Sequence, residues 1–326
     1  MKTIVKILLG LLALIIVVTV VLVSYVKFGL PKVGDPPDLQ VEITPERLER
    51  GEYLAWYGAG CLDCHTLRDP SVYSMPLMPG REGAGGFRFS HEMGFPGVIY
   101  SPNITPAGLG DWTDGEIFRA ITAGVDNVGN AIFPIMPYHD YAKMDREDIY
   151  AIIAYIRTLE PIESQIPERE LDFPLGLIVN MMPAEPELPD MPDPSDQVAY
   201  GQYVANAAGC IQCHTTQDDR GMIIPELLLA GGNEFPLPTG GIVRSANLTP
   251  DDETGIGKWT EEAFLLRFKI YADSSMVLHE VREGDLNTPM AWSLYGRMTE
   301  KDLRAIYAYM QTVKPLSNKV EKFTAP

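Results

Sequence analysis

The first strong pattern in the chain is an apolar run close to its N-terminus. Ile4–Val26 is almost entirely hydrophobic, and Lys6 and Thr19 are its main interruptions. A helix needs about 20 apolar residues to cross a bilayer. Because no convincing small-residue cleavage site ends the run, we expect segment 1–33 to be an uncleaved membrane anchor, with a long signal peptide as the alternative. In both cases the residues that follow are predicted to lie outside the cytoplasm.

Helical periodicity returns in two segments that each end at a proline, DREDIYAIIAYIRTLEP (145–161) and TEKDLRAIYAYMQTVKP (299–315). The apolar residues that fall on one face of these segments are Ile149, Ile152, Ile156 and Leu159 in the first and Leu303, Ile306, Met310 and Val313 in the second. The expected N-caps are Asp145 and Thr299, and Asp148 and Asp302 follow in capping-box-like positions. Further helices are predicted from Thr113 and Thr260, and short ones from Arg50 and Ala199. No sustained alternation typical of strands is present, so the predicted fold is mostly α.

The chain also repeats itself. The first copy contains, in order, GEYLAWYGAGCLDCHT, SPNITPAGLGDWTD, PIMPYHDYAKM and the helix predicted at 145–161. The second contains GQYVANAAGCIQCHT, SANLTPDDETGIGKWTE, TPMAWSLYGRM and the helix predicted at 299–315. We call these two helices the closing helices. Self-similarity at this scale predicts two copies of one domain. We therefore expect an anchor at 1–33, a first domain at 34–162, a linker at 163–198 and a second domain at 199–326. We call 34–162 the first repeat and 199–326 the second repeat.

The linker differs from both repeats in composition. It is acidic and rich in proline, most of all in PAEPELPDMPDP (183–194), which predicts an extended chain. Within it lies an apolar stretch, FPLGLIVNMM (173–182). We expect this stretch to pack on its own protein in preference to a partner subunit.

Composition narrows the range of partners and uses. The 326 residues carry a formal net charge of −18, with 44 acidic against 26 basic side chains. This balance argues against nucleic-acid binding, which would need a basic face, and favours protein partners that present positive charge. The excess of acid is concentrated in the first repeat and the linker, so we expect a basic partner to dock at the first repeat. The four cysteines are too few for a disulfide scaffold, and they occur as two pairs, each followed by a histidine.

The spacing Cys-x-x-Cys-His allows two thiols to add to the vinyl groups of a haem while the next residue gives an imidazole to the iron. It occurs at Cys61, Cys64 and His65, and again at Cys210, Cys213 and His214. Zinc would need ligands from pairs that lie far apart in separate repeats, and a thioredoxin-type motif would need a βαβ setting, which the sequence lacks. Two matches at equivalent positions of an exported repeat predict two covalently bound haem c groups.

The iron needs a sixth ligand from elsewhere in each repeat. Met136 and Met290 are the candidates, because each lies beside a proline in the loop before the closing helix. Met144 and Met298 also align between the repeats and are the rivals, although they adjoin the helix caps. His139 could replace Met136 in a bis-histidine centre.

The remaining histidines have no counterparts across the repeats. We expect His91, His139 and His279 to be surface or hydrogen-bonding residues, with His279 in an exposed loop (274–285) that only the second repeat contains.

Both repeats share an asparagine, a threonine and a tryptophan, namely Asn103, Thr105 and Trp112 in the first and Asn247, Thr249 and Trp259 in the second. Their amide, hydroxyl and indole groups could donate to haem propionates, and the tryptophans could equally fill core beside the ring. The Asn-x-Thr triplets match glycosylation sequons, but their recurrence before Pro106 and Pro250 favours a structural turn.

The shared motifs, taken as a set, resemble those of the membrane-bound cytochrome c subunits of bacterial periplasmic dehydrogenases, including the alcohol and gluconate dehydrogenases. The motifs are GCxxCHT, S-x-N-[IL]-T-P, G-[LI]-G-x-W-T, the Met-Pro or Pro-Met loop and D-[IL]-x-A-I-x-A-Y. The resemblance implies class I cytochrome c domains in tandem, haem c at the two cysteine pairs, and His65/Met136 and His214/Met290 ligation. It also implies a single-pass protein of the inner membrane that carries electrons in the periplasm from a dehydrogenase, or a quinol-oxidising complex, towards a respiratory acceptor.

Two other functions remain open at this point. One is a haem enzyme, such as a dihaem peroxidase or a thiosulfate-oxidising cytochrome, which needs an iron with an open position and acid–base residues. The other is a cytochrome subunit of a terminal oxidase complex. An electron carrier is favoured, because candidate protein ligands occupy both axial positions in each repeat.

Overall fold

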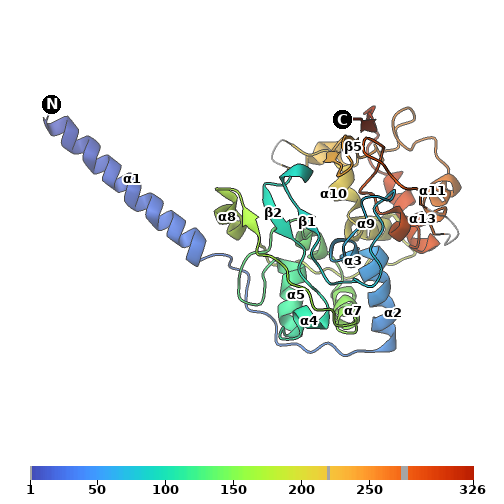
Figure 1. Ribbon diagram of the computed structural model, residues 1–326, viewed down its shortest axis with the longest axis horizontal. Helices are drawn as coiled ribbons and strands as arrows, with labels where there is room; N and C mark the ends of the chain where they lie inside the picture. Colours follow the sequence, from blue (N-terminus) through green and yellow to red (C-terminus); the bar gives the residue numbers. More distant parts are fainter. Residues whose placement is uncertain (1, 219–220, 273–277) are drawn as a thin grey trace.

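A computed structural model describes residues 2–218, 221–272 and 278–326. The predicted anchor forms one continuous helix, α1 (Lys2–Phe28), which projects from the body of the protein (Figure 1). By length and composition this helix could cross a membrane, and none of its residues is buried against the rest of the chain. The remaining elements form the body.

The first repeat is built from short helices and two short strands. Its elements are α2 (Pro45–Tyr53), the π-helix η1 (Leu54–Gly58), α3 (Cys61–Cys64), β1 (Arg88–Phe89), the 3-10 helix η2 (His91–Met93), β2 (Gly97–Tyr100), α4 (Pro106–Leu109), α5 (Asp114–Ala123), α6 (Tyr138–Tyr141) and α7 (Arg146–Ile156).

The linker and the second repeat continue in the same style. The linker holds β3 (Glu170–Leu171), α8 (Leu175–Ile178) and the 3-10 helix η3 (Val179–Met181). The second repeat consists of α9 (Gln197–Ala207), α10 (Cys210–His214), the 3-10 helix η4 (Pro225–Leu227), β4 (Glu234–Pro236), β5 (Ile242–Arg244), α11 (Glu261–Lys269), α12 (Trp292–Tyr295), α13 (Glu300–Met310) and β6 (Phe323–Thr324).

The helix before each cysteine pair packs closely against the closing helix of its own repeat, α2 on α7 and α9 on α13. Glycine makes this approach possible. A Cβ added at Gly51 would lie 1.9 Å from the carbonyl oxygen of Ala151, and one at Gly201 would lie 1.9 Å from that of Ala305. The same crossing therefore occurs at equivalent positions of both repeats.

The closing helices confirm the predicted caps and faces. Asp145 and Thr299 accept backbone N–H groups at the starts of α7 and α13. The predicted apolar faces lie in the core, with Ile149 and Leu303 fully buried. The helices end at Ile156 and Met310, before the prolines, because a short turn follows each of them. The helix at Thr113 begins with a full capping box to Glu116, as predicted.

Two small antiparallel sheets were missed by the sequence analysis. Their strand orders are β1-β2-β3 and β4-β5-β6. Each strand has only two to four residues, which is too short for an alternating pattern to be recognised. The helices before the cysteines also begin earlier than predicted, at Pro45 and Gln197, where Thr44 and Asp196 act as N-caps.

The linker is extended over most of its length, as predicted, but it is held to the first repeat. Its strand β3 pairs with β2. Farther on, the backbone N–H groups of Glu187 and Leu188 both donate to the carbonyl oxygen of Ala142, and that of Met191 donates to Asp145. The apolar stretch 173–182 packs partly on its own protein, since Val179 is buried while Phe173 is exposed.

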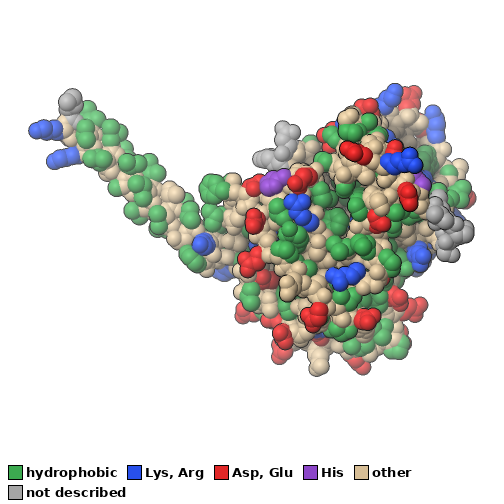
Figure 2. Space-filling model, in the orientation of Figure 1, with side chains coloured by type: hydrophobic (Ala, Val, Ile, Leu, Met, Phe, Trp, Pro, Cys, Tyr) green, Lys and Arg blue, Asp and Glu red, His purple; other side chains and the backbone are tan. Residues whose placement is uncertain are grey.

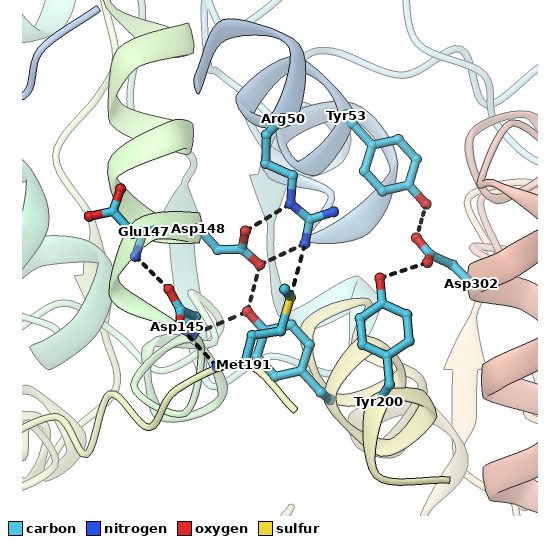
Figure 3. Close-up of polar contacts among 9 residues, drawn as sticks. Arg50, Tyr53, Asp145, Glu147, Asp148, Met191, Tyr200 and Asp302 are labelled. Atoms are coloured by element: carbon cyan, nitrogen blue, oxygen red, sulfur yellow. Dashed lines mark hydrogen bonds and ion pairs between the residues drawn. The ribbon is translucent and has the colours of Figure 1, made fainter. Parts of the chain in front are cut away.

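Side chains exchanged between the repeats join them into one body (Figure 3). The Tyr53 hydroxyl donates to Asp302 of the other repeat and accepts the backbone N–H of Thr299 at 3.2 Å. Reciprocally, the Tyr203 hydroxyl donates to Asp148 at 2.6 Å and accepts the N–H of Asp145 at 3.1 Å. Each repeat thus supplies a tyrosine to the start of the other's closing helix.

Asp148 and Asp302 also bind a partner within their own repeat. Arg50 pairs with Asp148 at 2.8 and 2.7 Å, and the Tyr200 hydroxyl donates to Asp302 at 2.8 Å. The expectation that these two carboxylates complete capping boxes is therefore wrong. They bind side chains across helices, where burial makes those hydrogen bonds more valuable than an exposed cap.

Candidate functional site

Both Cys-x-x-Cys-His motifs begin at a left-handed glycine. Gly60 (φ +65°) precedes α3 and Gly209 (φ +70°) precedes α10. A residue with a side chain is strained in this conformation, so glycine directs the chain into each motif. The four cysteines are free thiols, and each pair lies within one helical turn.

The histidine of each motif is oriented by a backbone carbonyl. His65 Nδ1 lies 2.8 Å from the carbonyl oxygen of Pro102, and His214 Nδ1 lies 2.8 Å from that of Ala246. Burial lowers the pKa of both imidazoles, against a smaller upward effect of these hydrogen bonds. When the ring is neutral and its Nδ1–H donates to a carbonyl, Nε2 carries no proton and its lone pair is available to bind a metal ion. The shared S-x-N motif thus supplies the carbonyl that orients the histidine.

The two motifs lie in one region of the molecule. Burial raises the pKa of the Cys64 thiol to about 12, and among the neighbouring charges that add to this are Asp63 and Cys213 of the second motif. Burial also raises the pKa of Cys213, to about 11, and Asp63 contributes to it from the first motif. Both thiols are therefore protonated and uncharged at neutral pH.

The candidate methionines occupy equivalent loops. Met136 and Met290 are both partly buried, and each carbonyl accepts the N–H of the residue two positions later, at 2.8 and 2.9 Å. The rivals Met144 and Met298 are essentially fully buried within the hydrophobic core. Their environment is that of core residues, which favours Met136 and Met290 as the available thioethers.

A tyrosine ties each methionine loop to the cysteine motif of its own repeat. The Tyr141 hydroxyl donates to the carbonyl oxygen of Ala59, and the Tyr295 hydroxyl to that of Ala208, both at 2.7 Å. This pair was not predicted, although Tyr141 and Tyr295 align between YHDYAKM and WSLYGRM. They hold the two halves of each candidate site together.

The methionine loop of the second repeat is also held by the first repeat. Ser74 Oγ donates to the carbonyl oxygen of Met290 at 2.7 Å and accepts the N–H of Trp292 at 3.0 Å. The fully buried Asn287 accepts the N–H of Ser74 at 2.9 Å, and its amide donates to the carbonyls of Pro70 and Val72. The residue of the first repeat that aligns with Asn287 is Phe133, so comparison of the repeats gave no signal for this contact.

No protein-family model matches the chain. A protein named alcohol dehydrogenase (quinone), cytochrome c subunit, from Gluconacetobacter polyoxogenes is 29% identical over 286 residues, which cover 82% of this chain and 56% of that protein. The gluconate 2-dehydrogenase cytochrome c subunit of Pantoea cypripedii is 27% identical over 290 residues, 82% of this chain and 59% of the relative. The chain resembles the cytochrome c subunits of bacterial dehydrogenases.

A shorter relative shows the same likeness. A diheme cytochrome c-type protein of Cereibacter sphaeroides is 28% identical over 228 residues, which are 67% of this chain and 72% of the relative. By contrast, the chain spans little more than half the length of the alcohol dehydrogenase subunit.

Similarity to cytochromes c implies covalently bound haem c, and the residues present fit this group. Each motif offers two unpaired, protonated thiols and a neutral imidazole with Nε2 free. Thioether bonds carry no charge, so attachment leaves no ionised sulfur in these partly apolar surroundings. Among the described residues, no group of three or more His, Cys, Asp and Glu side chains could hold a metal ion by itself.

The shared asparagines form turns. Asn103 Oδ1 accepts both the N–H and the hydroxyl of Thr105, and Asn247 Oδ1 accepts both groups of Thr249. Their amides donate to the carbonyls of Ile162 and Leu316, respectively. The turn expected from the sequence is confirmed, and each amide links it to the chain beyond the closing helix.

The two tryptophans differ in environment. Trp112 packs against the core, whereas Trp259 is 38% exposed and lines a hollow of about 420 Å³ along α11. The two tryptophans therefore do not have the same structural role, although they align in the sequence.

The unshared histidines lie at the surface, as predicted. His91 Nε2 is 2.9 Å from Asp172, and His279 stacks on Tyr73. Residues 274–277 of the predicted exposed loop lie outside the described residues. The part from 278 onward pairs with the first repeat, where the N–H of Val281 donates to Ser71.

Proposed function

We propose that this chain is a membrane-anchored dihaem cytochrome c that transfers electrons in the periplasm. Its donor would be a dehydrogenase or a quinol-oxidising complex, and its acceptor a respiratory component. The observation that supports this most strongly is the recurrence of one site in both repeats: free cysteines, a carbonyl-oriented histidine and a tyrosine-tethered methionine loop. The dehydrogenase subunits and the diheme cytochrome among the relatives support the same assignment.

In this proposal the two repeats are tandem class I cytochrome c domains at 34–162 and 199–326, joined by the linker at 163–198. Cys61 and Cys64 would hold one haem and Cys210 and Cys213 the other. His65 with Met136, and His214 with Met290, would hold the two irons. When bound, each haem would supply one-electron redox chemistry, and binding by both a thioether and an imidazole would raise its reduction potential.

The chain's own residues set the conditions for this transfer. The carbonyls of Pro102 and Ala246 orient the imidazoles, and a histidine and a methionine on each iron would leave it no position for a substrate. Arg68, close to Cys64 in the sequence, donates to the carbonyl oxygen of Pro289, next to Met290, at 3.3 Å, and this contact between the two candidate sites supports electron passage between them. Asn103, Asn247, Trp112 and Trp259 remain predicted propionate neighbours, although the two asparagine side chains already have partners in their turns.

The anchor would be segment 1–33, whose helix α1 would pass once through the inner membrane and leave the repeats in the periplasm. Its length and hydrophobicity support this placement.

Spectroscopy of the detergent-solubilised protein tests the proposal. We expect two haem c groups per chain, a weak far-red sulfur-to-iron band in the ferric state, and no high-spin signal. Met136→Ala and Met290→Ala should each remove about half of that band, since each haem contributes one Met–iron bond. Met144→Leu and Met298→Leu are the matched controls and should retain it.

High-spin ferric iron that binds cyanide rapidly in the unaltered protein would overturn the carrier assignment. Loss of the band only in the Met144 or Met298 variants would show that the proposed ligands are wrong.

A further inference from the structure

The linker contains a surface that the proposed electron transfer does not use. Phe173–Met182 has no charged residue, although the chain as a whole carries a net charge of −18. Three of its apolar side chains face solvent: Phe173 is 89% exposed, Met181 62% and Ile178 39%. Exposed apolar side chains grouped in this way mark an interaction surface.

This surface is held firmly in place by its own backbone. Just before it, β3 pairs with β2 of the first repeat. Val179, in the middle of the stretch, is only 1% exposed, so η3 is packed against the rest of the chain. The exposed side chains are therefore presented by an anchored segment and not by a free loop.

The surface lies beside the end of α1. Both α8 and η3 contact α1, and the Asn180 amide donates to the carbonyl oxygen of Val26 at 3.3 Å, in the last turn of that helix. Figure 1 shows α8 at the edge of the body next to the point where α1 enters it. Phe28, the last residue of α1, is itself 79% exposed.

Charges at this boundary favour a lipid neighbour. Lys27 and Lys32 flank the end of α1, and no acidic residue occurs between Phe173 and Met182. Basic side chains at a membrane surface are attracted by anionic headgroups, and apolar side chains at the same depth insert among the acyl chains. A bilayer that holds α1 must have its surface near Val26, where this segment lies.

We propose that Phe173–Met182 inserts into the outer interface of the bilayer beside α1, so that the chain contacts the membrane at two points. The inference rests on the proposed role of α1 as a membrane span. A single helix would leave the body free to tilt and rotate, whereas a second contact fixes which face of the haem-bearing body lies against the lipid. The occupant of this surface is the phospholipid bilayer and not a partner protein.

Photo-crosslinking of the full-length holoprotein tests this. The protein is placed in nanodiscs of phosphatidylethanolamine and phosphatidylglycerol doped with a phospholipid that carries a diazirine in its acyl chain, and crosslinked peptides are identified by mass spectrometry. We expect lipid adducts on α1 and on 173–182. Phe173→Glu and Met181→Glu should reduce the adducts on 173–182 several-fold and leave those on α1 unchanged.

Leu266→Glu is the matched control, because Leu266 is also 62% exposed but lies on α11, away from α1. It should alter neither set of adducts. Adducts on α1 without adducts on 173–182 would overturn this inference and leave the anchor intact. Absence of adducts on α1 would instead contradict the proposed span.

Discussion

At the scale of single residues, Gly51 and Gly201 determine how closely two pairs of helices can pack. Each brings the helix before a cysteine motif onto a carbonyl of the closing helix, with no room for a Cβ. The motif follows directly on that helix, so the same glycine that permits the crossing also positions the cysteines. The requirement is steric and local, and it is met independently in each repeat.

We expect Gly51→Ala and Gly201→Ala each to lower the free energy of unfolding by about 1–3 kcal/mol, because the new methyl group would overlap a backbone oxygen. Thermal unfolding in detergent, followed by far-UV circular dichroism, measures the effect. Gly176→Ala is the control, since a Cβ there meets nothing within 4 Å. Equal stability of all three variants would show that the helices separate at little cost.

At the scale of elements, the closing helices α7 and α13 carry both the internal packing and the contact between repeats. The hydroxyls of Tyr53 and Tyr203 each donate to a carboxylate near the start of the other repeat's closing helix and accept the backbone N–H of its N-cap residue. Loops act in the same way, because Ser74 of the first repeat donates to the carbonyl oxygen of Met290 in the second, and Asn287 of the second repeat holds Ser74 in place. The second candidate haem site is therefore incomplete without the first repeat.

Removing one hydroxyl from the tyrosine exchange should destabilise the body. We expect Tyr53→Phe or Tyr203→Phe to cost about 1–3 kcal/mol, because a carboxylate in the interface loses a donor. Tyr57→Phe is the control, since the Tyr57 hydroxyl makes no hydrogen bond within the described part of the chain. Chemical denaturation near neutral pH compares them, and indistinguishable midpoints would contradict the proposed importance of the exchange.

The same tyrosines predict an alkaline loss of stability. Burial, reinforced by the charge of Asp302, raises the pKa of Tyr53 above its ordinary value of 10, and burial with Asp148 does the same for Tyr203. The folded protein thus favours the protonated phenols, so their contribution is complete below pH 10 and is lost as the pH rises above it. We expect the unfolding free energies of the wild type and of Tyr53→Phe/Tyr203→Phe to converge above pH 10. A gap that stays constant to higher pH would be the opposite result.

Asn287→Ala should disturb only the second site. Without its amide, Ser74 and the loop around Met290 lose their fixed positions, so we expect about half of the far-red Met–iron band to weaken and one of two reduction potentials to fall. The first haem is the internal reference, and Asn130→Ala, at an exposed position, is the control variant. Equal changes at both haems would indicate general unfolding, and no change would show that the loop holds without Asn287.

At the scale of the whole molecule, charge is distributed unevenly over the body. Asp and Glu side chains gather along the lower edge of the view in Figure 2, where Figure 1 places α4 and α7 of the first repeat. Opposite charge on a partner would steer it to this edge, and propionates on bound haems would add further negative charge.

We expect the rate of electron exchange with a small lysine-rich cytochrome c to fall as ionic strength rises, because salt screens this attraction. A triple variant of the first repeat, Glu42→Gln/Glu49→Gln/Asp111→Asn, should exchange electrons more slowly at low salt. Its rate should also depend less on ionic strength. A second variant, Asp252→Asn/Glu253→Gln/Glu262→Gln, removes the same number of exposed acids from the second repeat and should have a smaller effect. A rate independent of salt would exclude electrostatic docking.

Features that depend on residues close together in the chain could be predicted from the amino-acid sequence. They include the repeat, the cysteine motifs, the N-caps of α7 and α13 and the apolar faces of these helices, because each follows from a fixed spacing. The long-range partners became visible only in the folded chain: Asp148 and Asp302 bind tyrosines of the opposite repeat, and Asn287 supports Ser74 across the same boundary. Such contacts join single positions with no periodicity between them, and the free energy that selects them arises from burial that exists only after the two repeats have packed.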